Sequence, residues 1–245
     1  DEYRCFPVGW PRSAPTHVTG LDVRAGNPRI VHHAAIFLVP AEHRDLPFAW
    51  AAEDERPGYR CFGGPTGDRG AQFPIQQLGA WLPGQDGLVY PDGIGIRVEP
   101  GAVLVVQMHY YTPAGAPEPD ASEVAFRVED QVTAPALHAP FLDLGWVVGG
   151  LEIPAGAATV EHQLVDDPRG FFRLVLGEAA DLPRGFRIHA ITHHMHRLGR
   201  SGRLERVRGR GSTALLNIPR WDFDWQRQYV LETPVEVRPG DRLRL

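Results

Sequence analysis

The 245-residue sequence contains no lysine, and all 25 of its basic residues are arginine. Complete replacement of lysine, in a chain rich in alanine, glycine and proline, indicates a GC-rich genome rather than a functional device. The formal net charge is −5, which argues against nucleic acid as the main partner. No apolar run approaches the roughly 18 residues that cross a membrane. The sequence therefore predicts no nucleic-acid partner and no membrane span.

Cysteine is scarce, because only Cys5 and Cys61 are present. Two cysteines cannot define a disulfide scaffold, and the absence of a C-x-x-C pair weakens a metal-binding interpretation. One bridge between them would close a loop of more than fifty residues, worth about 4 kcal/mol in the chain-entropy model, and would imply an exported protein. From the residues alone, two buried thiols, a metal pair and a disulfide all remain open.

The sequence also lacks a clear amphipathic helix of three turns. Short apolar or alternating runs bounded by Gly, Pro and Asp are typical of β-strands instead, and the 27 glycines and 23 prolines are spread along the chain as turn residues. The clearest runs span residues 29–39, 93–100, 102–111, 123–129 and 235–245. We predict an all-β protein, and at this length two antiparallel β-sandwich domains are expected rather than one.

A linker is predicted at residues 130–140, where two prolines and several small residues follow a strand. We place the domain boundary near residue 133, which gives an N-terminal domain of residues 1–133 and a C-terminal domain of residues 134–245. Each half contains one dense histidine cluster. Neither end resembles a natural terminus, so we expect a segment of a longer protein whose C-terminal domain is truncated.

The first histidine cluster combines His32 and His33 of "VHH" with His109 of "VVQMHYY". Adjacent residues on a regular strand face apart, so two neighbours binding one ion would need a local twist or bulge, or the use of different ring nitrogens. A lone buried histidine is usually structural. Burying several imidazoles, however, costs free energy unless each is hydrogen-bonded or metal-bound. Three neutral imidazoles suit Cu, Zn, Fe or Ni.

The second cluster lies in "ITHHMHRLGR", residues 191–200. Residues i and i+2 of a strand share a face, so His194 and His196 are predicted to converge while His193 faces away. No histidine follows His196, and the next acidic residue is Glu205, which excludes both the cupin pattern and the carbonic-anhydrase pattern. The third ligand of a metal at this pair must lie upstream, be a residue other than histidine, or fall beyond the chain.

Six motifs occur in the order found in one known family: DEYRC, VHH, LGAWLPG, VQMHYY, HMHRLGR and PVEVRPGD. The chain resembles a bacterial relative of the copper type II, ascorbate-dependent monooxygenases, the family of peptidylglycine α-hydroxylating monooxygenase and dopamine β-monooxygenase. The match covers nearly the whole chain and is loosest over residues 140–190. The resemblance implies two jelly-roll-like β-sandwiches that face each other across a cleft.

The resemblance also implies two copper ions. The first would be held by a His-His pair and a later Q-x-H-Y histidine, matching His32, His33 and His109. The second would be held by an H-x-H pair, matching His194 and His196, ahead of a glycine and a basic residue. The first copper would store and deliver the second electron, and the second would be the place where O2 is used against a substrate C–H bond. Ascorbate or another reductant would supply the electrons.

Other positions follow from the same resemblance. It implies a disulfide between Cys5 and Cys61, and with it a secreted or periplasmic location. Tyr3 and Gln107 match family positions near the first copper, where they would lie behind the ligands. Beyond the metal ligands no catalytic side chain is expected, because the metal would supply the chemistry while the protein fixes the geometry.

Two departures from the family pattern are informative. The family's second copper takes a methionine as third ligand, downstream of the strand that ends this chain. Met108 and Met195 are the only methionines here, and each is predicted to point away from the histidine face beside it, so we expect that ligand beyond residue 245. The peptide hydroxylase has an arginine two residues before its H-x-H pair, where Thr192 stands here, so a peptidylglycine substrate is not expected.

These observations predict a copper-dependent monooxygenase that hydroxylates a C–H bond of a small-molecule or other substrate with O2 and an external reductant. One alternative is a non-catalytic copper-binding or interaction module that retains the fold and the histidines. Another is a mononuclear zinc or iron enzyme that uses only one cluster.

Overall fold

The structure is a computed structural model and describes residues 2–70, 72–82, 85–112, 118–180, 182–223 and 225–245. It consists mostly of β-strands in several antiparallel sheets, which confirms the all-β class. The chain divides into two compact units, Asp1–Ala139 and Pro140–Leu245. We call them unit 1 and unit 2 and describe each by itself. The division falls a few residues after the position near residue 133 that the sequence suggested.

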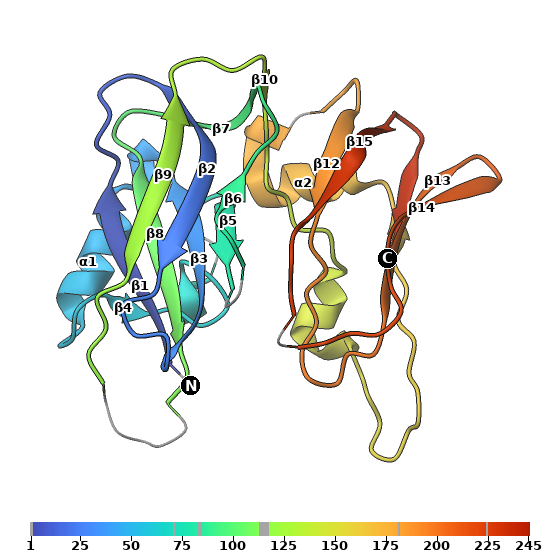
Figure 1. The fold of residues 1–245 in the computed structure, drawn as a ribbon, viewed down its shortest axis with the longest axis horizontal. Coiled ribbons are helices and arrows are strands. Elements are labelled where there is room, and N and C mark those ends of the chain that lie inside the picture. Colours follow the sequence, from blue (N-terminus) through green and yellow to red (C-terminus); the bar gives the residue numbers. More distant parts are fainter. Residues whose placement is uncertain (1, 71, 83–84, 113–117, 181, 224) are drawn as a thin grey trace. The chain divides into compact units, whose positions relative to one another are not determined.

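The first sheet of unit 1 has five strands, including β3 and β8, which contain the first histidine cluster, and its strands can be followed in Figure 1. Its order is β4-β1-β8-β3-β5, and every pairing is antiparallel. The strands are β1 (Glu2–Gly9), β3 (Val31–Val39), β4 (Tyr59–Arg60), β5 (Gln76–Trp81) and β8 (Val103–Tyr110). The predicted strands 29–39 and 102–111 are therefore confirmed as β3 and β8. The last two residues of the LGAWLPG motif lie outside the described residues.

The second sheet of unit 1 has the order β10-β7-β2-β6, with β9 also paired to β2. The strands are β2 (Thr16–Arg24), β6 (Leu88–Val89), β7 (Ile94–Val98), β9 (Glu123–Glu129) and β10 (Ala134–Pro135). β7 and β9 confirm the predicted strands 93–100 and 123–129. The pairing of β10 with β7 is parallel, so the expectation of wholly antiparallel sheets is wrong at this short edge strand.

Strand β3 is apolar on both faces because two different cores cover it. Ala34, Ile36 and Leu38 belong to the larger core, which includes residues of both sheets. The alternate residues, such as Ala35 and Phe37, belong to a smaller core on the opposite face. A strand that is buried on both faces has a nearly continuous apolar sequence, which explains the run that follows the histidine pair.

The smaller core is covered in part by helix α1 (Asp45–Glu53), which lies beside β1 and β4 (Figure 1). Its Trp50 packs among Tyr59, Phe73 and the two cysteines. The sequence analysis predicted strands only, so it missed this helix and also α2 (Pro168–Leu176) of unit 2. Each has nine residues, fewer than the three turns by which an amphipathic pattern is recognised.

Unit 2 contains a four-stranded sheet of order β11-β16-β13-β14 and a two-stranded sheet of β12 and β15. The strands are β11 (Val165–Asp166), β12 (Phe186–Ile191), β13 (Gly202–Arg208), β14 (Gly211–Ile218), β15 (Tyr229–Val237) and β16 (Arg242–Arg244). A small core joins the two sheets through Ile191, Leu204, Val237 and Leu243. The predicted strand, turn and strand at 235–245 correspond to the end of β15, a turn and β16.

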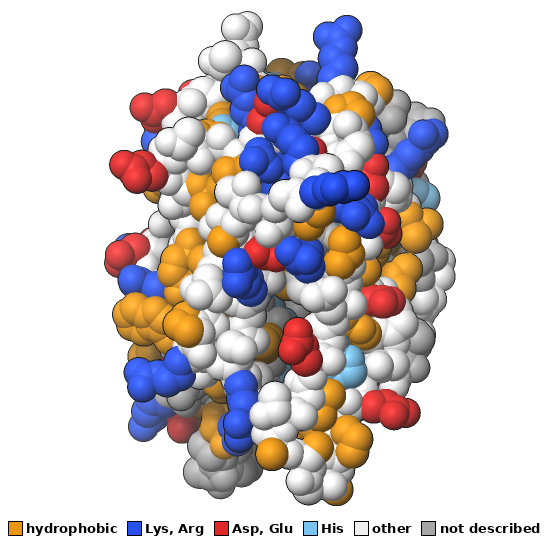
Figure 2. Space-filling model, turned by 90° about the vertical axis from the view of Figure 1, so that its right-hand side faces the viewer, with side chains coloured by type: hydrophobic (Ala, Val, Ile, Leu, Met, Phe, Trp, Pro, Cys, Tyr) orange, Lys and Arg blue, Asp and Glu red, His pale blue; other side chains and the backbone are white. Residues whose placement is uncertain are grey.

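Arginine side chains gather on the side of the molecule seen in Figure 2. In unit 2, arginines of β13 and β16 form ion pairs. Arg208 contacts Asp241 at 2.6 Å, and both Arg203 and Arg244 contact Glu205. These arginines are therefore neutralised locally by carboxylates.

Short helical turns complete the two units. They are Ala41–His43, Gly67–Arg69, Trp146–Gly150 and Gly177–Ala180. Within the described ranges, no helix combines the length and apolar character needed to cross a membrane.

Candidate metal centre

The register of three neighbouring strands aligns the first histidine cluster. β8 lies between β1 and β3, and His109 of β8 pairs with Tyr3 on one side and with His33 on the other. Directly opposed residues on adjacent antiparallel strands hold their side chains within contact distance. His109 also shares a face with Val103 and Val105, which belong to the smaller core. The cluster is therefore built on the same face of the sheet as that core.

A bulge brings His32 to the same place. The pairing between β3 and β8 runs from Val31 opposite Tyr110 to His33 opposite His109, with a register shift between them. Two residues of β3 thus lie opposite one residue of β8, and His32 is the extra residue, as in a β-bulge. In a regular strand His32 would face away from His33. Of the possibilities that would let two neighbouring histidines bind one ion, the structure contains the bulge.

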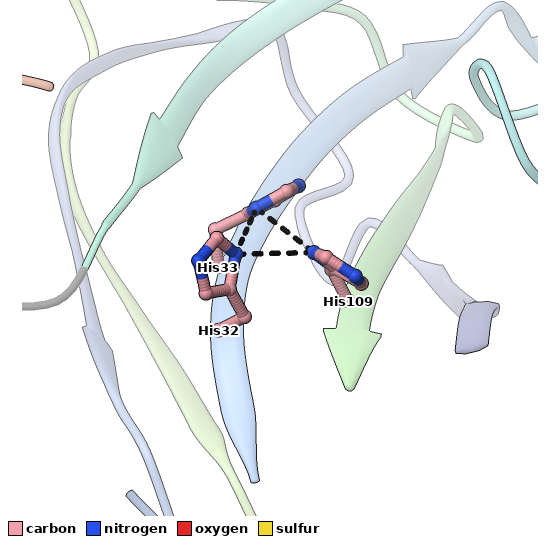
Figure 3. Close-up of side chains that lie close together, drawn as sticks. All are labelled: His32, His33 and His109. Carbon is pink, nitrogen blue, oxygen red and sulfur yellow. Dashed lines mark hydrogen bonds between the residues drawn. The ribbon is translucent and has the colours of Figure 1, made fainter. Parts of the chain in front are cut away.

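The three imidazoles present their Nδ1 atoms to one another (Figure 3). The Nδ1 atom of His32 lies 3.1 Å from that of His33 and 3.1 Å from that of His109. The Nδ1 atoms of His33 and His109 are 3.3 Å apart. Among the residues that the structure describes, this is the one group of three or more His, Cys, Asp or Glu side chains with donor atoms close enough for a shared metal ion.

Hydrogen bonding among the rings cannot account for this triangle. Each Nδ1 carries either a proton or a lone pair, so at most two of the three contacts can join a donor to an acceptor, and the third must oppose like groups. A cation shared by three lone pairs removes that conflict. The circle through three points 3.1, 3.1 and 3.3 Å apart has a radius of about 1.8 Å, close to the roughly 2.0 Å of an imidazole–metal bond.

The electrostatics of His109 favour neutral imidazole, the form that binds metals. His109 is only 7% exposed. Burial lowers the pKa of His109 to about 4, and the neighbouring His32 acts in the same direction. At neutral pH His109 is therefore ready to donate a lone pair without first losing a proton.

The predicted disulfide between Cys5 and Cys61 is present, with their Cα atoms 5.9 Å apart. It is fully buried in the smaller core. The turn that precedes Tyr59 passes so close to β1 that a Cβ at Gly58 would overlap the carbonyl oxygen of Cys5, and Gly58 has a φ of +72° that favours glycine. The disulfide thus fastens the loop after β4 to the strand that contains Tyr3.

Tyr3 and Gln107 both lie next to the first cluster, in different ways. The Tyr3 ring stacks on His109 with centroids 4.1 Å apart and planes 6° apart. Gln107 is buried, and its Nε2 donates a hydrogen bond of 2.6 Å to the carbonyl oxygen of Cys61. Cys61 in turn donates its N–H to the carbonyl oxygen of Tyr3. Gln107 therefore braces the disulfide loop, whereas Tyr3 contacts a cluster ring directly.

The second cluster does not lie on a strand, so that prediction is wrong. β12 ends at Ile191, and residues 192–196 are irregular. The reason is the partner strand, because Ile191 pairs with Tyr229, the first residue of β15. Within the described part of the chain, the ladder between β12 and β15 therefore ends at this pair, and the residues after Ile191 do not continue it. The chain then turns tightly, with Gly199 donating its N–H to the carbonyl oxygen of His196 at 2.9 Å.

His194 and His196 nevertheless lie together, with ring centroids 5.1 Å apart. The corresponding separations in the first cluster are 4.7 to 5.3 Å. Both residues are exposed, while His193 is buried. A Cβ at Gly202 would lie 3.3 Å from the His193 ring and 3.3 Å from the Met195 methyl group. His193 therefore packs against the start of β13.

Gln226 is a buried residue beside this pair that the sequence analysis did not single out. Its Oε1 lies 2.7 Å from Nδ1 of His194. Desolvation of the ring lowers the pKa of His194, the Gln226 contact opposes this, and His196 adds to the lowering. No local pattern marks Gln226, because it is 32 residues from His194 in the sequence and flanked by aromatic and charged residues.

Neither methionine joins the other side chains into a larger donor group. Met108 is buried in the larger core, on the face of β8 opposite His109. Met195 packs toward Gly199, where an added Cβ would lie 2.8 Å from the Met195 Cβ. The pair His194 and His196 therefore supplies two imidazoles, while the cluster in unit 1 supplies three.

No protein-family model matches the sequence, and a search of curated proteins finds no match. Function is therefore inferred from the sequence motifs and from the geometry of the two clusters.

Proposed function

We propose that this protein is a copper-dependent monooxygenase, related to the type II, ascorbate-dependent copper monooxygenases. The observation that supports this most strongly is the convergence of the Nδ1 atoms of His32, His33 and His109 within 3.3 Å of one another. A set of three neutral imidazoles is suited to copper among the first-row metals. The family's arrangement of two jelly-roll-like sandwiches across a cleft, with one copper on each, is part of the proposal.

Each cluster has its own task in this proposal. His32, His33 and His109 would hold the first copper as neutral ligands, in a site shielded on one side by the stacked Tyr3 ring. His194 and His196 would hold the second copper from exposed positions that a substrate can reach. Bound copper would supply one-electron redox chemistry with O2. The imidazoles fix its position, and the disulfide fixes the strand that contains Tyr3.

The overall reaction would insert one oxygen atom into a C–H bond. Substrate R–H, O2, two electrons and two protons give R–OH and water. The two electrons would come from an external reductant such as ascorbate, which is oxidised. A disulfide-bonded chain fits an oxidising compartment, so we propose a secreted or periplasmic location.

A second candidate is a copper-binding module without catalysis. The feature that favours it is the incomplete donor set of unit 2, in which two exposed imidazoles stand without a third protein ligand among the described His, Cys, Asp and Glu side chains. Such a protein would retain tight copper binding at the first cluster alone.

Copper titration followed by electron paramagnetic resonance separates these functions. We expect the full chain to bind two Cu(II) ions. The His109→Ala variant should lose one of them, and the variant with His194→Ala and His196→Ala should lose the other. Binding of a single copper at the first cluster would favour the binding module, and preference for zinc or iron at that cluster would contradict both copper functions.

Catalysis is tested with the copper-loaded chain, ascorbate and ¹⁸O2. A panel of small amines, amides and aromatic compounds with activated C–H bonds provides candidate substrates. The expected result is substrate-dependent consumption of O2 and of ascorbate, with one ¹⁸O atom in the product. The variant without His194 and His196 should bind the first copper and produce no hydroxylated product. Equal product formation by this variant would contradict the proposed role of the pair.

A further inference from the structure

Gln226 makes two hydrogen bonds that together define its orientation. It is 6% exposed, so its amide group has little access to water. Its Nε2 lies 2.9 Å from the carbonyl oxygen of Phe223, and its Oε1 lies 2.7 Å from Nδ1 of His194. A buried amide of this kind must satisfy its donors and its acceptor within the protein.

The contact with Phe223 decides which end of the amide faces His194. A backbone carbonyl oxygen only accepts hydrogen bonds, so it must face the NH2 group of Gln226. The amide oxygen then faces the His194 ring, and an oxygen that only accepts requires a proton on Nδ1. In the neutral imidazole this leaves Nε2 with the lone pair. The tautomer of His194 thus follows from the amide orientation.

We infer that Gln226 is a positioning residue that holds His194 with its proton on Nδ1, and so makes Nε2 the nitrogen that can bind a metal. The inference depends on the proposed function only for the identity of that metal. It also makes the two clusters chemically different, because His32, His33 and His109 converge through Nδ1. In the His194–His196 pair the Nδ1 atom of His194 is already engaged.

The segment that contains Gln226 is attached to the histidine loop at two further points. The backbone N–H of Trp221 donates a hydrogen bond of 2.7 Å to the carbonyl oxygen of Arg200. The Arg197 guanidinium lies 5.6 Å from the centroid of the Phe223 ring, a distance at which cation–π attraction acts. These contacts hold the Gln226 amide in place beside a loop that is not part of a β-ladder. A histidine that binds a metal is commonly oriented in this way by a partner on its other nitrogen.

The test is the tautomer of His194 in the metal-free full chain, measured by long-range ¹H–¹⁵N correlation spectra at pH 8. The signals of His194 are assigned as the imidazole cross-peaks that disappear in the His194→Asn variant. We expect the Nδ1–H form in the wild type. Gln226→Met, which keeps the size and removes the acceptor, should shift His194 toward the Nε2–H form that free histidine prefers. Gln226→Glu, which keeps an acceptor for Nδ1 but loses the donor to Phe223, should retain the Nδ1–H form.

Copper affinity provides the second measurement. Gln226→Met should weaken copper binding at the pair by about 10- to 100-fold, while Gln226→Glu weakens it less and both leave the first cluster unchanged. Gln163→Leu is the matched control, because Gln163 is an exposed glutamine of the same unit.

The outcomes distinguish this inference from the proposed function. An Nε2–H tautomer in the wild type, or a tautomer and copper affinity unaffected by Gln226→Met, would overturn the role of Gln226. If the tautomer depends on Gln226 as expected but the wild-type pair binds no copper, the positioning role stands and the proposed function fails. Because the wild-type tautomer is measured without any substitution, an unfolded variant does not prevent the test.

Discussion

The two histidine clusters are held by very different backbone structures. In unit 1, His33 and His109 face each other on adjacent strands, and a bulge adds His32 to them. In unit 2, His194 and His196 lie in an irregular segment that begins where β12 ends. The first cluster is therefore fixed by a sheet whose two faces are covered by cores, and the second by a tight turn and by single contacts such as that of Gln226.

The difference shows that a sheet and a loop offer different properties to a metal site. The sheet fixes the positions of several side chains, and the loop leaves its side chains exposed. In unit 1 three Nδ1 atoms lie within 3.3 Å of one another, so a metal ion would require little rearrangement of the rings to bind there. The pair in unit 2 is exposed, as the proposed hydroxylation of a substrate would require. Binding and catalytic residues are common on loops that a rigid scaffold positions. Four predictions test this contrast.

The largest expected effect is the loss of a ligand from the rigid cluster. His109→Ala should abolish tight copper binding in unit 1, a loss well beyond the roughly 100-fold that follows removal of an outer partner of a ligand. Copper bound at the His194–His196 pair should be unaffected. Competitive titration with a chelator measures both sites. His43→Ala, at a histidine of unit 1 outside the cluster, is the control, and retained tight binding in His109→Ala would show that the triangle of Nδ1 atoms is not a metal site.

The second effect concerns the disulfide. Replacing Cys5 and Cys61 with serine should lower the free energy of unfolding of unit 1 by about 4 kcal/mol, because the bridge closes a long loop in the unfolded chain. It should also weaken copper binding at the first cluster, since Cys61 and Tyr3 are joined by a backbone hydrogen bond. Hydrogen exchange followed by mass spectrometry reports each unit separately. A uniform loss of protection in both units would contradict the separation of the two clusters.

The third effect is the pH dependence of the stability of the metal-free protein. The pKa of His109 is about 4 in the folded chain and about 6.5 in an unfolded one. Because the folded pKa is the lower one, His109 does not reduce the free energy of unfolding above pH 6.5. As the pH falls toward 4, His109 is protonated in the unfolded state before it is protonated in the folded state. The free energy of unfolding should therefore fall by about 3 kcal/mol.

Urea denaturation between pH 7 and pH 4 measures this dependence, in the presence of a chelator. The wild type should lose stability over that window, and His109→Leu should lose less of it because the titrating group is gone. Identical slopes for the two proteins would mean that His109 does not titrate as its burial implies.

The smallest effect should come from the turn that closes the second cluster. A Cβ at Gly199 would lie 2.8 Å from the Met195 Cβ and 2.9 Å from a ring carbon of Trp221, so Gly199→Ala must displace the turn after His196. We expect about a tenfold loss of copper affinity at the pair, similar to the loss of an outer partner of a ligand, and no change in unit 1. Gly170→Ala is the control, because a Cβ there meets no other atom within 4 Å. Unchanged affinity in Gly199→Ala would mean that the turn does not orient His196.

Four strands of unit 1 could be predicted from the sequence because they follow local rules, whereas the long strands β1 and β2 were not among the predicted runs. The runs that became β3, β7, β8 and β9 alternate or are uniformly apolar, and each is bounded by turn residues. Strand geometry also indicated that His32 and His33 could bind one ion only through a local twist or bulge or through different ring nitrogens, and the structure contains a bulge there. Helices α1 and α2 were not predicted, since each is too short for its periodicity to stand out.

In unit 2, the same rules failed at the segment of most interest. Period-two geometry selected His194 and His196 as partners, and their rings do lie 5.1 Å apart. They do so in an irregular segment, however, because the strand that would have paired with it begins only at Tyr229. A strand exists only where another strand offers it hydrogen bonds, and sequence alone does not say where the partner begins.

The sequence by itself determined the all-β class, the two strands β3 and β8 that contain the first cluster, and the residue types able to bind a metal, because those depend on local periodicity and side-chain chemistry. The tertiary structure decided which nitrogens meet. The register of β1, β8 and β3 placed Tyr3, His109 and His33 opposite one another on neighbouring strands. A hydrogen bond between residues 32 positions apart placed Gln226 beside His194. Register and long-range contacts result from the packing of whole sheets and loops, so no local stretch of sequence contains them.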